Sequence, residues 1–158
     1  MAAQLEPYRR RFAYHAWATR TLTGALTDDS EHERARALLA HVLAADLIWL
    51  RRLRGEYSGD LVLWPWLTAG QVRSLSHESA AGYPAYLAAL PDAGLASSVR
   101  YTNMKGDAFE TVVSDILEHV LLHGAYHRGQ VADELRQCGT AVPGTDYIVW
   151  VRAGEPNA

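Results

Sequence analysis

The chain has 158 residues, of which 49% are hydrophobic and 21% are charged. This composition is typical of a single globular domain, and we expect one domain over residues 1–158. The formal net charge of −3 is too small to favour nucleic acid or a membrane surface as a partner, so we expect neither.

The apolar residues of the first half follow helical spacing. They recur at steps of three and four over residues 5–26 and again over 31–54, which predicts two amphipathic helices. Residues 57–68 are expected to form a loop, because a proline lies between two tryptophans there and proline disfavours a long helix or a central strand. A third helix is predicted from about residue 69 to 90, with a glycine and a proline weakening its middle.

The second half predicts one long helix and two short flanking segments. Residues 97–105 partly alternate in polarity, which favours a short extended segment or hairpin. The last helix is predicted to begin at Asp107, with Glu110 three residues on as in a capping box, and to end at Gly139. The aromatic tail, 142–151, is expected to pack back on the helices. Four helical segments in one domain predict an all-α four-helix bundle.

Cysteine content and hydropathy bear on location. Cys138 is the only cysteine, so an internal disulfide is excluded and a reducing compartment is favoured. The longest apolar run, residues 37–50, is interrupted by a histidine and an aspartate, and it is too short and too polar to span a bilayer. The first residues lack a long apolar stretch as well. We therefore expect a cytoplasmic protein.

Histidines give the strongest chemical signal in the sequence. His119, His123 and His127 repeat every four residues, which places them near one face of the last predicted helix. His119 and His127 lie roughly 12 Å apart along the helix axis. That is too far for one ion, because metal–nitrogen distances are about 2.0–2.1 Å. One ion is therefore bound either by His119 with His123 or by His123 with His127.

A third ligand is expected from another helix, and His41 is the best candidate. It is in phase with the apolar residues of the second predicted helix, so it points inward, where an imidazole needs a partner. His15, near the apolar phase of the first helix, is the reserve candidate. His32 and His77 lie in polar sequences and are expected at the surface. A lone inward histidine is more often a hydrogen-bonded core residue, but a helical pair together with His41 favours a metal.

The type of site follows from the residue beside the pair and from the number of ligands. Gly124 follows His123, where an HExxH peptidase needs a glutamate as general base, so we do not expect peptidase activity. Three imidazoles would leave at least one coordination position open, which is typical of catalytic sites. Such a position accepts water or a thiol, and the metal acidifies either ligand.

The segment from His123 to Gln130, His-Gly-Ala-Tyr-His-Arg-Gly-Gln, resembles the HxxxHRGQ segment of the DinB-like family of damage-inducible helical-bundle proteins. His41, followed by Trp49, is similar to the first ligand of that family. Residues 14–18 resemble its Tyr-x-x-Trp-Ala start, and residues 139–146 resemble its Gly-x-x-x-Pro-x-x-Asp ending. The resemblance covers nearly the whole chain and is loose only in the middle.

The resemblance implies a ligand set and an architecture. His41, His123 and His127 would be the metal ligands, in a four-helix bundle of up-down-down-up topology that commonly forms a homodimer. His119 would be a neighbour of the site, and Gln130 would hydrogen-bond a ligand or a group next to one.

Two other residues of the segment are expected to be structural. Arg128 points about 100° away from its neighbouring ligand and is expected to form an ion pair. Gly129 is expected to permit close helix packing.

The function that these residues imply is metal-dependent chemistry. Zinc or nickel is the expected ion, with manganese and iron as alternatives. Because the family includes thiol-dependent transferases, the resemblance implies a transferase that uses a low-molecular-weight thiol on a small-molecule substrate. Two alternatives remain open: a non-enzymatic metal- or ligand-binding stress-response protein, and a metal-dependent hydrolase. No catalytic residue is assigned from the sequence.

Overall fold

The computed structural model describes residues 4–157 and is mostly helical. In chain order, its helices, 3-10 turns and strands are α1 (Glu6–Thr23), η2 (Ser30–His32), α2 (Glu33–Leu53), α3 (Ala69–Ser79), α4 (Gly82–Ala89), η3 (Asp92–Ala96), β1 (Ser98–Thr102), β2 (Ala108–Val112), α5 (Val113–Gln137) and α6 (Tyr147–Arg152). The strands form an antiparallel pair. Among the described helices, none is both long enough and apolar enough to cross a bilayer.

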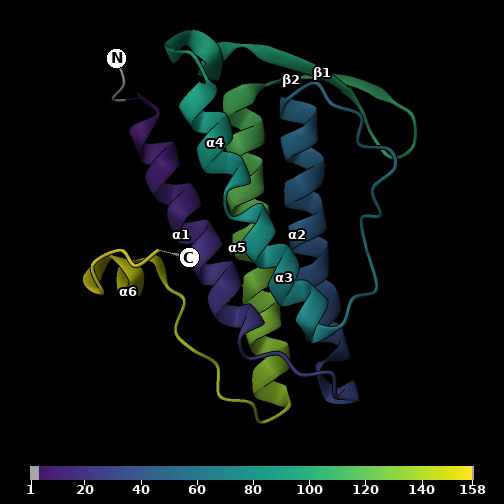
Figure 1. Ribbon diagram of the computed structural model, residues 1–158, viewed down its shortest axis with the longest axis vertical. Helices are drawn as coiled ribbons and strands as arrows, with labels where there is room; N and C mark the ends of the chain where they lie inside the picture. Colours follow the sequence, from purple (N-terminus) through teal and green to yellow (C-terminus); the bar gives the residue numbers. More distant parts are fainter. Residues whose placement is uncertain (1–3, 158) are drawn as a thin grey trace.

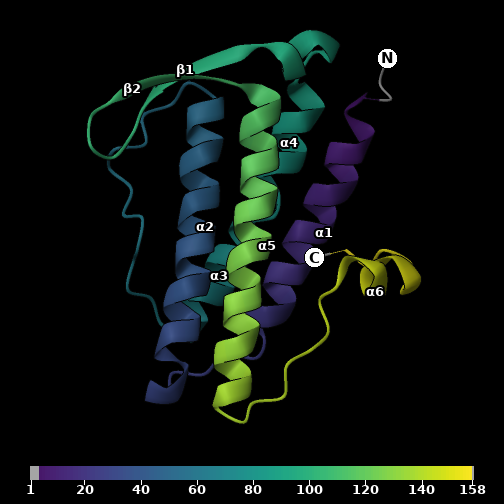
Figure 2. The ribbon, with the colours of Figure 1, turned by 180° about the vertical axis from the view of Figure 1, so that it is seen from behind.

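The helices pack side by side around a common core. α5 contacts both α1 and α2, while α3 and α4 follow one another along α1 and α2. In Figure 1, α1 and α5 run downward, whereas α2, α3 and α4 run upward. The loop of residues 54–68 returns the chain from the top of α2 to the start of α3. The hairpin of β1 and β2 lies across the upper ends of α2 and α5 (Figure 2).

Two clusters of buried apolar side chains hold the helices together. One includes Leu22, Leu39, Val72 and Leu135, from α1, α2, α3 and α5. The other includes Phe12, Leu50, Leu87 and Ile116, from α1, α2, α4 and α5. Burying each such side chain contributes about 1.5–3 kcal/mol, so apolar packing is the main stabilising term. Buried polar side chains, among them His15, Asp46 and Arg128, lie between the two clusters along α1, α2 and α5.

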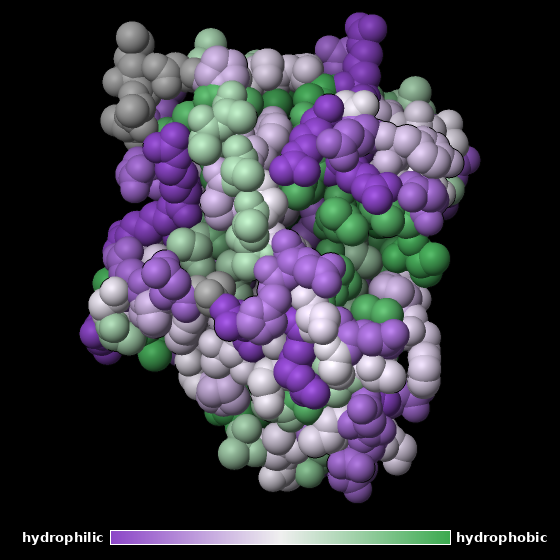
Figure 3. Space-filling model, viewed as in Figure 1, coloured by the Kyte–Doolittle hydropathy of each residue, from purple (hydrophilic) through white to green (hydrophobic). Residues whose placement is uncertain are grey.

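The core is partly open to solvent between α2 and α3. Figure 3 shows hydrophobic side chains gathered beside α2 on this face. Leu47, Leu50 and Leu75 line a hollow of about 210 Å³ there. Packing of α2 against α3 is therefore less complete than packing of α2 against α5.

The third predicted helix is two helices in the structure. α3 begins with a capping box, in which Thr68 Oγ1 accepts from the Gln71 backbone and Gln71 Oε1 accepts from the Thr68 backbone. It ends at Ser79, and α4 begins at Gly82. Pro84 explains the break, because proline lacks the N–H that would continue the helical hydrogen bonds and is tolerated in a first turn.

The predicted start of the last helix at Asp107 is wrong. Glu110 lies in β2 opposite Arg100, and its Oε2 accepts from Arg100 Nε at 2.8 Å. α5 begins only at Val113, whose N–H donates to the Ser97 carbonyl at 2.8 Å. Strand pairing therefore overrides the local capping pattern, and the predicted hairpin extends further along the chain than residue 105.

The end of α5 and the tail agree with the sequence. Gly139 has a φ of +73°, the left-handed conformation that glycine favours just after a helix. The tail then returns to α1, where the Tyr14 hydroxyl donates to the Thr145 carbonyl at 2.7 Å. Trp150 of α6 is only 1% exposed, so the prediction that the tail packs back on the helices is confirmed.

Candidate metal centre

Three histidines from two helices meet between α2 and α5. One ring nitrogen from each of His41, His123 and His127 lies within 4.8 Å of the other two, and the Nε2 atoms of His41 and His123 are 3.1 Å apart. Two nitrogens bound tetrahedrally to one ion would lie about 3.3 Å apart. The His41–His123 spacing fits a shared ion, and small rotations of the imidazoles would close the widest gap in the cluster.

The loop of residues 54–68 fixes the His41 ring. His41 Nδ1 donates to the Leu63 carbonyl at 2.9 Å, and the ring stacks on the Trp64 indole with centroids 3.8 Å apart and an angle of 5°. A proton on Nδ1 leaves the Nε2 lone pair free, and Nε2 is the atom that faces His123. A hydrogen bond to one imidazole nitrogen commonly orients the other nitrogen toward a metal.

Gln130 orients the His127 ring in the same way. His127 Nδ1 lies 2.7 Å from Gln130 Oε1. An amide oxygen only accepts hydrogen bonds, so the proton is on Nδ1 and Nε2 of His127 is left free. The two residues are three positions apart on α5, where helical side chains are neighbours. The structure therefore places Gln130 against one of the three histidines.

The surroundings of the cluster favour the neutral form of two imidazoles, those of His41 and His123. Burial lowers the pKa of His41. Burial, followed by repulsion from His127, His41 and His119, lowers the pKa of His123 to about 4. Neutral imidazole is the form that binds a metal ion. His41 and His123 can therefore bind a divalent ion at pH 7 without first losing a proton.

His119 lies beside the cluster and outside it. It is exposed on α5, with its ring centroid 5.1 Å from that of Trp49 and 5.5 Å from that of His123. His77 is exposed on α3, as expected. Helix geometry left two ligand pairs open, His119 with His123 and His123 with His127. The structure places His41 next to the second pair.

The expectation that His32 lies at the surface is wrong. It is 6% exposed and bonded on both sides. Nδ1 accepts from the Thr27 backbone at 3.0 Å, and Nε2 lies 2.7 Å from Thr140 Oγ1. This imidazole joins the start of α2 to the segment after α5. Its partner at residue 140 is 108 positions away, so local sequence polarity could not indicate its burial.

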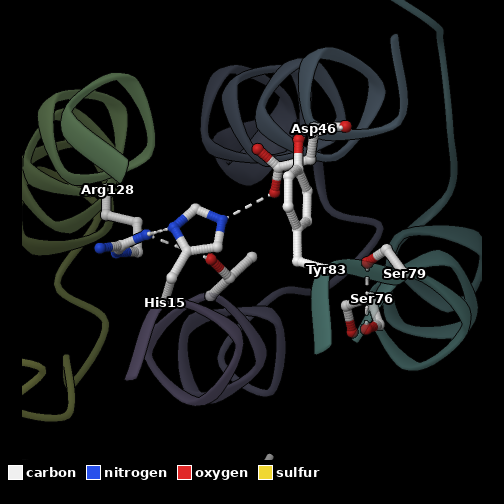
Figure 4. Close-up of polar contacts among 7 residues, drawn as sticks. His15, Asp46, Ser76, Ser79, Tyr83 and Arg128 are labelled. Atoms are coloured by element: carbon white, nitrogen blue, oxygen red, sulfur yellow. Dashed lines mark hydrogen bonds and ion pairs between the residues drawn. The ribbon is translucent and has the colours of Figure 1, made fainter. Parts of the chain in front are cut away.

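His15, the reserve ligand, belongs to a separate buried polar group (Figure 4). Its Nε2 donates to Asp46 Oδ2 at 2.7 Å, and its Nδ1 accepts from Arg128 Nη1 at 2.9 Å. Both ring nitrogens are therefore occupied, and neither is available for a metal. Arg128 is not in the expected ion pair among the described residues, because the neutral His15 ring lies between it and Asp46.

Gly124 makes room for His15. In the sequence, this glycine was notable only because it stands where a peptidase would need a glutamate. A Cβ at Gly124 would overlap the His15 ring and approach Arg128 Nη1 at 3.0 Å. Gly129, which was expected to permit close packing, is exposed, and a Cβ there would meet nothing within 4 Å. The close approach of α1 to α5 therefore depends on Gly124, and the expectation for Gly129 is wrong.

The sequence model of the DinB family matches residues 4–156. The chain belongs to the DinB family. It is 26% identical over 156 residues to Protein DinB of Bacillus subtilis (strain 168), covering 89% of this chain and 91% of that protein. The resemblance drawn from the His123–Gln130 segment is thus confirmed.

The DinB fold is also seen in a solved relative. The crystal structure of a DinB-like protein from Bacillus cereus ATCC 10987 matches this DinB-family chain with a TM-score of 0.73 at 20% identity. The match covers 88% of this chain and 95% of that one. At this identity the likeness shows a shared fold.

Proposed function

We propose that this DinB-family chain binds one divalent transition-metal ion through His41, His123 and His127, in a four-helix bundle of up-down-down-up topology. The observation that carries the proposal is the convergence of three imidazoles from α2 and α5 within 4.8 Å. The hydrogen bonds from His41 to Leu63 and from His127 to Gln130 support it, because each frees an Nε2 lone pair for the ion.

The donor set favours borderline ions. Three imidazole nitrogens suit zinc or nickel, while manganese and iron prefer sites that add carboxylates. Within residues 4–157, the cluster is formed by histidines alone, without an acidic side chain. We therefore expect zinc or nickel in preference to manganese or iron.

The same absence favours a thiol over water as the nucleophile. A bound divalent ion would act as a Lewis acid that holds a low-molecular-weight thiol as its thiolate. A free thiol has a pKa of about 8.5, far below that of water, so a thiol loses its proton far more readily. No carboxylate belongs to the described cluster to serve as a base for water. A thiol-dependent transferase is therefore favoured over a hydrolase.

In the proposed reaction the thiol proton leaves to solvent, and the sulfur forms a bond to an electrophilic carbon of a small substrate. The leaving group departs with the electron pair of the broken bond. Exposed apolar side chains surround the histidines: Trp64 stacks on His41, and Tyr126 packs on His127 with centroids 5.1 Å apart. This surface favours a substrate with apolar character.

Turnover assays test the reaction. Protein is supplied with a small thiol and an electrophilic substrate, with and without a chelator. Loss of turnover on removal of either the thiol or the metal supports the transferase, and His127→Ala should abolish it. Ester hydrolysis without thiol would instead support a hydrolase. Metal binding without turnover in either assay would support a non-enzymatic stress-response protein.

Two further expectations concern the assembly and the location of the protein. We propose a homodimer in the cytoplasm, as the DinB resemblance and the single cysteine suggest. Light scattering of the purified protein checks the dimer, and a mass of one chain at micromolar concentration would contradict it.

A further inference from the structure

Arg52 near the end of α2 is buried, and no acidic side chain among the described residues forms an ion pair with it. It is 7% exposed, and its guanidinium carbon lies 4.5 Å from the Trp49 ring centroid and 4.9 Å from that of Tyr101. Its Nε is buried with no hydrogen-bond partner in the part of the chain that the structure describes. Burial lowers the pKa of Arg52, and among the described residues only the smaller effect of Tyr101 opposes it.

The other buried arginines show how unusual this arrangement is. Arg36 and Arg128 are 7% and 4% exposed. Arg36 Nη1 donates to the Thr27 and Asp29 carbonyls at 2.7 and 2.8 Å, and Arg128 donates to the His15 ring. Buried polar groups in proteins are nearly always hydrogen-bonded, and an exception points to a missing water or ion. Arg52 is such an exception.

The Arg52 side chain lines a pocket large enough for a small molecule. The pocket, of about 620 Å³, lies between residues 55–59 and the strand and turn of residues 100–106, and small-molecule sites are about 300–1,000 Å³. Ser58, which is 7% exposed, lines the same space. Among the described residues of the lining, Glu56 is the only acidic one. It is exposed and does not enter the causes of the Arg52 pKa shift.

We propose that this pocket binds a small organic anion, a carboxylate or a phosphate, on the guanidinium of Arg52. The planar fork of arginine matches either group with two parallel hydrogen bonds, which would supply the partners that the protein does not. Trp49 and Tyr101 hold the fork in place by stacking. Trp49 also packs on His119, which lies beside the histidine cluster.

The direct test follows the Arg52 Nε–Hε resonance by NMR in chelator-treated, 15N-labelled protein. Inorganic phosphate and succinate are titrated separately, and Arg52→Lys assigns the signal. We expect a saturable shift of this resonance with at least one probe. In the variants, which lack this resonance, binding is read from the backbone amides of residues 55–59 that line the pocket. Arg52→Gln should raise the half-saturation concentration about tenfold or more, and Arg52→Lys, which keeps the charge and loses the fork, should raise it by less.

Arg100→Gln is the matched control. Arg100 also lines the pocket, but its side chain is 84% exposed and paired with Glu110, so its loss should change binding about twofold or less. A shift with phosphate alone identifies a phosphate-bearing ligand, and a shift with succinate alone identifies a carboxylate-bearing one. Either result supports the proposal.

Two results would overturn the anion site. One is the absence of a saturable Arg52 shift with both probes in the wild-type protein, a measurement that needs no variant to fold. The other is equal weakening by Arg52→Gln and Arg100→Gln in folded proteins. Arg52 would then serve only to clamp α2 to β1 through its aromatic neighbours. Because the titrations use metal-free protein, their outcome is independent of metal binding.

Discussion

His41 Nε2 and His123 Nε2 face each other at 3.1 Å, although the two residues are 82 positions apart in the chain. The contact joins α2 to α5, and the His41 and His127 rings are each held by a hydrogen bond on their own side of the site. His41 is fixed by the Leu63 carbonyl and the Trp64 indole. A pair of inward-facing imidazoles with preset orientation is what a small ion needs, since little ordering is left to occur on binding.

Gln130→Ala should weaken metal binding without removing a ligand. The change deletes the acceptor that holds His127 Nδ1 at 2.7 Å, and loss of such a partner typically costs about 10–100-fold in affinity. Gln137→Ala is the control on the same helix, because Gln137 bonds to Asp133 away from the cluster. Competition with a colorimetric chelator measures both variants. Equal affinities for Gln130→Ala and Gln137→Ala would contradict the positioning role.

The stability of the metal-free protein should fall in mild acid because of His123. The pKa of this ring is about 4 in the folded protein against 6.5 for an unperturbed histidine. The folded state therefore binds fewer protons between these values. The contribution of the neutral His123 ring to the free energy of unfolding is complete above about pH 6.5 and is lost as the pH falls toward 4.

Urea unfolding at several pH values measures this contribution. We expect the wild type to lose about 1–2 kcal/mol more than His123→Gln over this range, after allowance for solvent screening of a partly exposed ring. Parallel pH profiles for the two proteins would show that the His123 pKa is not lowered.

Gly124→Ala should destabilise the protein by about 1–3 kcal/mol through overpacking. The new methyl group would overlap the His15 ring and crowd Arg128 Nη1. Gly129→Ala is an ideal control five residues along α5, because its methyl group would meet nothing within 4 Å. There the substitution should be neutral or stabilising by up to about 1 kcal/mol, since alanine is the better helix former. Urea unfolding of both variants measures these changes in the free energy of unfolding.

Asp46→Ala should cost about 2–4 kcal/mol, because it leaves the buried His15 Nε2–H without its acceptor. Asp60→Ala removes an acid of the same type whose side chain is 54% exposed in its pair with Arg51. A surface pair of this kind contributes at most about 1 kcal/mol. Thermal or urea unfolding separates the two, and a small loss at Asp46 would show that the His15 group is not a stabilising element.

Features that depend on helical periodicity were predictable from the sequence. Spacing on α5 limited the ligand pairs to two, and the phase of α2 pointed to His41. Features that depend on distant partners were not. His32 is buried because it reaches Thr140, and nothing near residue 32 reports that contact.

The remaining wrong predictions concern segments whose local sequence fits two structures about equally well. Asp107 and Glu110 have capping-box spacing, yet Glu110 pairs with Arg100 across the hairpin. The two glycines of the His123–Gln130 segment look alike in sequence, and only packing distinguishes them. Gly124 faces His15, whereas Gly129 faces solvent.

Metal content tests the central claim most directly. Protein purified without a histidine tag is dialysed against a small excess of zinc or nickel. Its metal content per chain is then measured by elemental analysis. We predict one ion per chain for the wild type and for His77→Ala, whose histidine is exposed and outside the cluster, and a large loss for His123→Ala. No bound ion in the folded wild type, or equal metal content in all three proteins, would contradict the three-histidine site.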